Sequence, residues 1–317
     1  MVAIENSKLG IVGAGSVGTS TAYAAMIRGS ARHVRLYDID AARAEAEVLD
    51  LAHGSQFTGA SDIDGGADIK HLTGCDVVVI TAGAKQTPGQ SRLDLAATNV
   101  EILRSLVPKI LEAAPHAILI LVTNPCDVLT VAARQISGLP GHRVFSSGTV
   151  LDTARLRWLL AERAGVAQQS VHAHIVGEHG DTEFPLWSTA TIGATPLLDW
   201  QRDGASAFTQ QELESVAEDV RTAAYRVIEG KGATNYAIGL SAARIVEAVL
   251  NDQHAVLPVS TVLDGAFGVE GVALSVPSIV SAGGARPVTS TPFDGVEYAR
   301  LHASAEALQK AQASLGL

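Results

Sequence analysis

The segment at residues 177–181, with the sequence GEHGD, places one histidine between glycines directly after a strand-like apolar run. Imidazole titrates near neutral pH, so His179 is suited to give a proton to a carbonyl oxygen while a hydride adds to the carbonyl carbon. A single histidine in such a segment is more often structural. We therefore expect His179 to do chemistry only if a carboxylate elsewhere in the chain orients it.

Residues 151–155, with the sequence LDTAR, supply a carboxylate and a cation in one helical run. Asp152 and Arg155 are three positions apart, so both lie on the same face of a helix. The carboxylate can hold an imidazolium while the guanidinium binds a substrate carboxylate through two parallel hydrogen bonds. The alternative is an exposed ion pair that stabilises the helix by roughly a few tenths of a kcal/mol.

A glycine-rich turn at residues 13–18, with the sequence GAGSVG, follows the first strand-like run and opens a helix. In this context the sequence is typical of the dinucleotide-binding fingerprint. Its glycines allow a tight turn, close approach of backbone amides to a pyrophosphate and close packing of the helix on the sheet. A glycine-rich turn without a ligand is the alternative. The predicted cofactor contacts here are Gly13, Gly15, Ser16, Val17 and Gly18.

Asp38 ends the second strand-like run, twenty residues after Gly18. A carboxylate at this place can accept hydrogen bonds from both ribose hydroxyls of adenosine and would repel a 2′-phosphate. The sequence therefore predicts NAD rather than NADP as the cofactor. Another role for Asp38, compatible with the first, is to cap the helix that begins near residue 41.

Two more strand ends carry small or polar residues, Thr81-Ala82-Gly83 and Thr123-Asn124. Ligands of open α/β sheets bind at the carboxyl ends of the strands, where these segments meet. Small residues let a cofactor pass close to the backbone, and Asn124 can hydrogen-bond near a nicotinamide or a substrate oxygen. Because Asn before Pro is also an ordinary turn signal, a purely structural role is the alternative for Asn124.

The elements that must position these residues follow from the hydrophobic pattern. Parallel strands covered on both faces are expected to be near-continuous apolar runs. Such runs occur at residues 8–12, 33–38, 76–81, 117–123 and 144–146, and helix-period stretches lie at 17–28, 41–52 and 93–114. Strand followed by helix, repeated, predicts an α/β fold with a Rossmann-type doubly wound parallel sheet over residues 1–147.

The pattern changes after residue 147. Helical runs are expected at residues 152–164, 209–229 and 295–312, with a strand at 171–176. We predict an α+β catalytic domain over residues 148–317, with the last helix covering its core.

Composition narrows the classes of function. The chain has 317 residues, and its two cysteines, Cys75 and Cys126, show no disulfide or zinc spacing, so we expect a reducing compartment and no metal site. The N-terminus lacks the pattern of an export signal, and no apolar run reaches the roughly 20 residues that cross a bilayer, which favours a cytoplasmic protein. A net charge of -10 and an aromatic content of 4% argue against nucleic acid or a membrane as partner.

These motifs, together with residues 86–95, occur in the order and approximate spacing of one family. The chain resembles the L-lactate and malate dehydrogenase family over essentially its whole length. The resemblance implies that NAD-dependent hydride transfer interconverts pyruvate and L-lactate, with malate or another L-2-hydroxy acid as the alternative. It also implies that His179 is the acid/base, Asp152 its orienting partner and Arg155 the carboxylate anchor. Arg92 would polarise the substrate carbonyl when a loop closes.

Three further positions are assigned by the same resemblance. Gln86 stands where lactate enzymes carry glutamine and malate enzymes carry arginine. Its neutral side chain suits the methyl group of pyruvate, because a second substrate carboxylate would need a counter-charge. Thr234 matches the pocket threonine and is expected to contact the substrate, and Asn99 is assigned to cofactor binding.

A possible regulatory site starts from Arg157, which is two residues beyond Arg155 and about 200° away around the same helix. Arg157 and His172 match the residues with which bacterial L-lactate dehydrogenases bind fructose 1,6-bisphosphate between subunits. The resemblance therefore implies this effector and a homotetramer. The alternative is a surface arginine and an unrelated strand histidine.

Two other classes of protein remain as alternatives. An NAD-dependent glycosidase can share this fold type, but it needs a divalent metal, and the sequence offers no convincing Cys/His ligand set. A non-catalytic NAD-binding sensor would have no need for His179, Asp152, Arg155 and Arg92 together.

Overall fold

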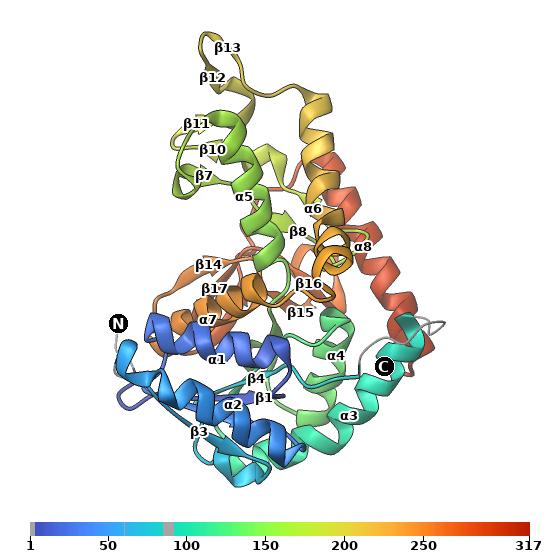
Figure 1. The fold of residues 1–317 in the computed structure, drawn as a ribbon. Coiled ribbons are helices and arrows are strands. Elements are labelled where there is room, and N and C mark those ends of the chain that lie inside the picture. The colour runs from blue at the N-terminus through green and yellow to red at the C-terminus, as the bar shows by residue number, and fades with distance from the viewer. Residues whose placement is uncertain (1–3, 60, 85–91) are drawn as a thin grey trace.

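The computed structural model describes residues 4–59, 61–84 and 92–317, and for residues 92 and 93 only the backbone. One sheet of eight strands forms the base of the fold (Figure 1). Its parallel strands are β1 (Lys8–Val12), β2 (His33–Tyr37), β3 (Asp62–Gly66), β4 (Val77–Ile80), β5 (Ile118–Leu121) and β6 (Val144–Ser146), and its antiparallel strands are β15 (Ser260–Asp264) and β16 (Glu270–Ser275). The order β16-β15-β6-β5-β4-β1-β2-β3 places the crossover between β1 and β4, which is the predicted doubly wound arrangement.

Helices cover both faces of this sheet. They are α1 (Ser16–Arg28), α2 (Ala41–His53), α3 (Arg92–Ala113), α4 (Cys126–Ser137) and α7 (Tyr236–Leu250). Successive strand residues point to opposite faces, so Val79 packs in one core with α1 and α7 while Val78 packs in another with α3 and α4. Because α7 comes from the second half of the sequence, the two halves share one hydrophobic core.

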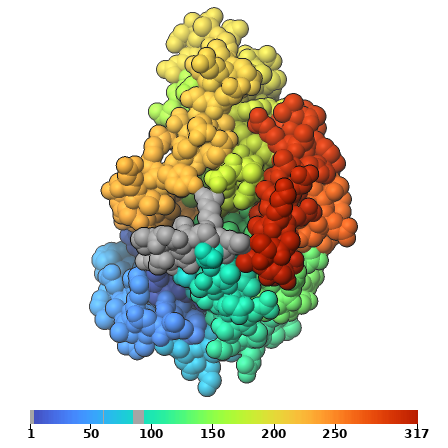
Figure 2. Space-filling model, turned by 90° about the vertical axis from the view of Figure 1, so that its right-hand side faces the viewer, coloured from blue at the N-terminus to red at the C-terminus, as the bar shows by residue number. Residues whose placement is uncertain are grey.

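Helices α5 (Val150–Ala164) and α6 (Gln210–Lys231) lead into the upper part of the molecule in Figure 1. Small sheets complete the fold: β7 (Val171–His172), β10 (Thr191–Ile192) and β11 (Thr195–Pro196); β8 (Ile175–Val176) and β9 (Phe184–Pro185); β12 (Gln201–Arg202) and β13 (Ala205–Ser206); β14 (Ala255–Leu257), β17 (Ser278–Ser281) and β18 (Gly284–Pro287). In Figure 1, β14 and β17 lie lower than the others, beside α7. Helix α8 (Gly295–Ser314), red in Figure 2, runs along one side of the molecule toward the teal start of α3. Within the described ranges, no helix is long and apolar enough to span a membrane.

The single strand predicted at residues 171–176 was wrong, because the structure breaks it into β7 and β8, which belong to different sheets. Side chains of α5 bind the backbone between the two strands. Arg157 Nε donates to the carbonyl oxygen of Ala173 at 2.9 Å, and the amide of Ile175 donates to Thr153 Oγ1 at 2.8 Å. These groups are therefore no longer available to a neighbouring strand.

Several elements were not recognised in the sequence: β3, α4, α7 and every strand from β9 to β18, including β15 and β16 of the main sheet. Strand β3 has the sequence DIDGG and lies at the edge of the sheet with mostly polar, exposed residues, so it lacks the apolar run that marks the other parallel strands. Helix α7 packs against α1, and its Gly239 is the point of closest approach, since a Cβ placed there would lie 2.7 Å from the carbonyl carbon of Ser20.

The contact between α1 and α7 gives a stability prediction. Gly239→Ala forces the two helices apart, so we expect the free energy of unfolding to fall by about 1–3 kcal/mol in urea denaturation. Gly230→Ala, in the exposed end of α6, is the matched control, because a Cβ there meets no heavy atom within 4 Å. The control should be neutral or stabilise by up to about 1 kcal/mol. Equal stability of the two variants would contradict the close helix packing.

Candidate active site

A cavity of about 640 Å³ lies at the carboxyl ends of the parallel strands β1, β2, β4 and β5. Most of the residues predicted to bind the cofactor line it. They are Gly13, Gly15, Ser16, Val17, Gly18, Asp38, Thr81, Ala82, Gly83, Thr123 and Asn124. Distant segments of the chain therefore meet at this edge, as expected for ligand sites of open α/β sheets.

The glycines of the first turn show that the cavity is shaped for a ligand that approaches the backbone. A Cβ on Gly18 would lie 1.8 Å from the carbonyl oxygen of Gly13, so this position is filled by the protein itself. A Cβ on Gly15 would meet no heavy atom within 4 Å. The space above Gly15 is thus open at the N-terminus of α1, where backbone amides and the helix dipole favour a phosphate group. A dinucleotide pyrophosphate fits this turn.

Asp38 is fixed next to the same turn. Its Oδ2 accepts a hydrogen bond from the Ala14 amide at 2.6 Å, and its Oδ1 accepts one from the Asp40 amide at 3.0 Å. The alternative role as a helix cap was wrong, because Asp40 caps α2 by accepting from the Arg43 amide. Asp38 therefore holds its carboxylate at the end of β2 for a ligand in the cavity.

Asn99 is the one predicted cofactor residue that does not line the cavity. Its side chain is only 1% exposed. It accepts a hydrogen bond from the Ala84 amide at 2.8 Å and donates one to the Asn124 carbonyl oxygen at 2.9 Å. Asn99 thus joins the segments that follow β4 and β5, both of which line the cavity.

A second cavity of about 470 Å³ adjoins the first, because Leu95 and Asn124 line both. Asp152, Arg155 and His179 all line this second cavity. The three residues that the sequence analysis selected for acid–base chemistry and carboxylate binding therefore lie beside the dinucleotide-type cavity.

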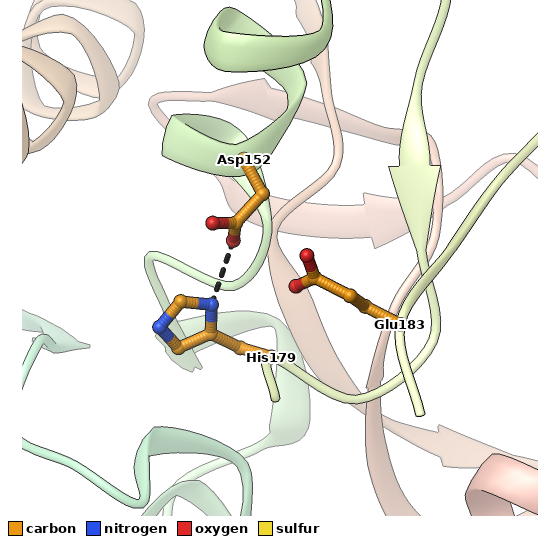
Figure 3. Close-up of side chains that lie close together, drawn as sticks. All are labelled: Asp152, His179 and Glu183. Atoms are coloured by element: carbon orange, nitrogen blue, oxygen red, sulfur yellow. Dashed lines mark hydrogen bonds and ion pairs between the residues drawn. The ribbon is translucent and has the colours of Figure 1, made fainter. Parts of the chain in front are cut away.

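Asp152 connects these three side chains. Its Oδ2 lies 2.7 Å from His179 Nδ1 (Figure 3). Its Oδ1 accepts a hydrogen bond from an Arg155 guanidinium nitrogen at 2.6 Å. The Asp152 carboxylate is 2% exposed, and the His179 ring is 26% exposed toward the cavity. Because Nδ1 is bound to Asp152, Nε2 is the ring atom left to face a ligand.

Charge and burial set the proton affinities of this pair. Burial alone would raise the pKa of Asp152, but the charge and hydrogen bond of His179, followed by Arg155, hold it below its usual range. Burial alone would lower the pKa of His179, but the charge and hydrogen bond of Asp152, with smaller contributions from Glu183 and Asp127, raise it to about 9. His179 is therefore protonated near neutral pH and can act as an acid.

Two buried carboxylates in the site were missed in the sequence. Asp127, in the first turn of α4, accepts a hydrogen bond from the His179 amide at 2.8 Å and so fixes the backbone of the histidine. Glu183 lies four residues after His179 and is 5% exposed. Asp127 follows closely after Asn124, which was a usable signal, whereas no spacing rule pointed to Glu183.

Three predicted substrate residues are absent from the described residues that line the two cavities. Thr234 lies half-buried between α6 and α7 and lines neither of them. Gln86 lies outside the described residues. Arg92 is the first residue of α3, and its side chain also lies outside the described part.

Arg157 faces away from this site, toward the segment between β7 and β8. Besides its bond to the Ala173 carbonyl, its guanidinium lies 3.1 Å from His174 Nε2. Burial, then the charges of Arg157 and His172, lower the pKa of His174 to about 4. His174, which the sequence analysis did not select, is therefore uncharged near neutral pH; it lies against Arg157 and within the electrostatic influence of His172.

Comparisons with known proteins agree with this geometry. Residues 7–146 match the family model for the lactate/malate dehydrogenase NAD binding domain, and residues 149–315 match that for the lactate/malate dehydrogenase alpha/beta C-terminal domain. The L-lactate dehydrogenase of Bifidobacterium animalis subsp. lactis (strain AD011) is 48% identical over 314 residues, which cover 99% of this chain and 98% of that protein. The L-lactate dehydrogenase of Thermus aquaticus is 45% identical over 309 residues, covering 98% and 99%.

Solved structures give the same result. The minor L-lactate dehydrogenase from Enterococcus mundtii, in its ligands-bound form, has a TM-score of 0.93 at 39% identity and covers 98% of both chains. A lactate dehydrogenase from a Medee basin deep-sea metagenome library has a TM-score of 0.93 at 37% identity, covering 98% of this chain and 99% of that one.

Fold and site together define an NAD-dependent oxidoreductase. The chain belongs to the lactate/malate dehydrogenase family, which confirms the resemblance, the enzyme class and the fold class predicted from the sequence.

The Asp152 contact gives a prediction about His179. Asp152→Asn removes the charge that stabilises the imidazolium, so we expect the His179 pKa to fall from about 9 by roughly two units. The measurement is a pH titration of ¹³C-labelled histidine by NMR, with His179→Ala used to assign the signal. Glu162→Gln, at an exposed position of the same helix, should leave the titration unchanged. An unchanged pKa in Asp152→Asn would contradict the assigned charge pairing.

Proposed function

We propose that this protein is an NAD-dependent L-lactate dehydrogenase that interconverts pyruvate and L-lactate. The observation that carries the proposal is the buried Asp152 between His179 and Arg155, beside the dinucleotide-type cavity. The curated relatives named L-lactate dehydrogenase support lactate over malate, which remains the alternative product.

The proposed mechanism assigns one task to each side chain. Asp152 fixes the tautomer and orientation of His179, whose Nε2 gives its proton to the carbonyl oxygen of pyruvate and takes it back from lactate. Arg155 uses guanidinium N–H groups not bound to Asp152 to hold the substrate carboxylate. Bound NADH supplies the hydride. Arg92 is proposed to stabilise the developing charge on the carbonyl oxygen.

NAD is the proposed cofactor, and NADP is disfavoured. Asp38 already accepts two backbone hydrogen bonds and lines the cavity, so a 2′-phosphate there would meet a fixed negative charge. We propose that residues 1–147 form the NAD-binding domain and residues 148–317 the catalytic domain. Gln86 and Thr234 are proposed to contact the substrate, with Gln86 favouring pyruvate because it is neutral.

We also propose a cytoplasmic homotetramer. Tyr23 and Ile27 on α1 and Leu240 on α7 are each more than half exposed, at 57%, 54% and 52%. Neighbouring apolar side chains of this size on two packed helices support a subunit contact on this face.

The proposed activity is tested by following NADH oxidation with pyruvate, oxaloacetate and 2-oxo-4-methylpentanoate. We expect the highest kcat/KM with pyruvate, and NADH to be preferred over NADPH. His179→Ala should lower kcat by about two to four orders of magnitude, because a positioned acid is lost, while NADH binding is retained. Higher kcat/KM with oxaloacetate would select the malate alternative, and no oxidation of NADH with any of the three would refute the proposal.

Fructose 1,6-bisphosphate is proposed as an activator bound at Arg157 and His172. Arg157 contacts His174, and the charges of Arg157 and His172 both act on that ring, so the two basic side chains lie near each other, which supports an anion site. We expect the effector to lower KM for pyruvate by about fivefold or more and to stabilise the tetramer in sedimentation. His172→Ala should lose both effects while keeping its activity without the effector. Identical saturation curves with and without the effector in the wild-type enzyme would exclude this site.

A further inference from the structure

Glu183 is a buried carboxylate to which the mechanism above gives no task. Its side chain is 5% exposed and lines the same cavity as His179. One donor-type atom from each of Asp152, His179 and Glu183 lies within 4.8 Å of the others. Figure 3 shows the Glu183 carboxylate pointing toward the Asp152–His179 pair from the segment that leads into β9.

Nothing in the described part of the chain neutralises Glu183 by a direct bond. Asp152 uses its two oxygens for His179 and Arg155, whereas no side-chain hydrogen bond to Glu183 is present among the described residues. Burying a carboxylate without a hydrogen-bond or ion-pair partner lowers the stability of the folded protein. The presence of such a group therefore needs a reason, which is either the packing of its side chain or its charge. Glu183 lines a cavity, so its side chain is not needed to fill the core. Its charge is therefore the better explanation for a carboxylate at this position.

The charged groups around His179 come from four elements. Asp152 and Arg155 belong to α5, Asp127 to α4 and Arg221 to α6, and Glu183 lies on the same segment as His179. Glu178 lines the cavity as well, but its carboxylate accepts a hydrogen bond from Thr182 Oγ1 at 2.6 Å. Asp152, Asp127 and Glu178 each accept a hydrogen bond from a described residue. Among these four carboxylates, Glu183 is the one whose oxygens accept no hydrogen bond from the described residues.

Burial, followed by the charge of Asp152, raises the pKa of Glu183 to about 8, against the opposing influence of His179, Arg155 and Arg221. The sign of its effect on His179 follows. Below that pH Glu183 is neutral and acts weakly on the ring. As pH rises through about 8, its negative charge forms beside the imidazolium and opposes the loss of the His179 proton.

We propose that Glu183 is a positioning residue that keeps His179 protonated in alkaline solution, through the negative charge that it holds against the ring. This inference rests on the proposed function for its catalytic consequence, but not for its effect on the histidine. Loss of the charge, with the shape of the side chain kept, should therefore lower the proton affinity of His179.

The direct test is an NMR titration of ¹³C-labelled histidine in the protein without cofactor. Glu183→Gln should lower the His179 pKa by about one unit relative to wild type. Glu183→Asp keeps a carboxylate and should lower it less, and Glu178→Gln, at the neighbouring carboxylate in the same cavity, should also shift it less. An equal or higher His179 pKa in Glu183→Gln would overturn the proposal. If Glu183→Gln fails to fold in urea denaturation experiments, Glu183→Met, which also removes the charge and keeps a side chain of similar length, decides by the same criterion.

The catalytic consequence is measured by single-turnover oxidation of bound NADH at saturating pyruvate. The alkaline limb of its pH profile should move down by about one pH unit in Glu183→Gln, with little change below pH 7. A rate lowered equally at every pH would show a structural role and overturn the proposal. Wild-type protein inactive on all 2-oxo acids would refute the proposed function alone, because the NMR titration needs no turnover.

Discussion

The structure depends on one buried interaction, the hydrogen-bonded ion pair of Asp152 and His179. A carboxylate that is 2% exposed is stable only with partners of opposite charge, and α5 provides one of them itself through Arg155. The other must come from a segment elsewhere in the chain, which fixes how α5 and the loop after β8 pack. Asp127 then holds the backbone of that loop through the His179 amide. The same contacts therefore orient the imidazole, compensate the buried charge of Asp152 and hold α5 against the loop that carries His179.

The sheet places this pair next to the cofactor cavity. The carboxyl ends of the parallel strands lie at one edge of the sheet. The turn after β1, Asp38 after β2 and Asn124 after β5 therefore line one cavity, although they are far apart in the sequence. Helix α7 and strands β15 and β16 return from the second half of the chain and join the same sheet and its core. This shared core sets the distance between the two cavities, which meet at Asn124 and Leu95.

Much of this could be predicted from the sequence, for physical reasons that differ between elements. Strands β1, β4, β5 and β6 are buried on both faces, so their apolar runs mark them. Strand β3 is an exposed edge and carries no such run, and the break between β7 and β8 depends on side chains of α5 that no local pattern reveals. In the site, the types and spacing of Asp152, Arg155 and His179 were compatible with one chemistry, and the resemblance to one family decided for it over an exposed ion pair. Asn99 was assigned to cofactor binding by the resemblance, and in the structure its amide joins two backbone segments that line the cavity.

In the proposed mechanism the proton donor His179 and the carboxylate anchor Arg155 bind the same aspartate, and their charges give a reason for this arrangement. Asp152 carries one negative charge, while Arg155 and protonated His179 carry two positive ones, so the three groups together have a single net positive charge. A substrate with one carboxylate matches that charge. Loss of the His179 proton leaves the three groups neutral, and the same substrate would then enter without compensation. Because both cations bind the same carboxylate, the proton that His179 gives up in the proposed mechanism is also part of the positive charge that faces the substrate carboxylate. In that mechanism, substrate binding and proton supply are coupled through Asp152.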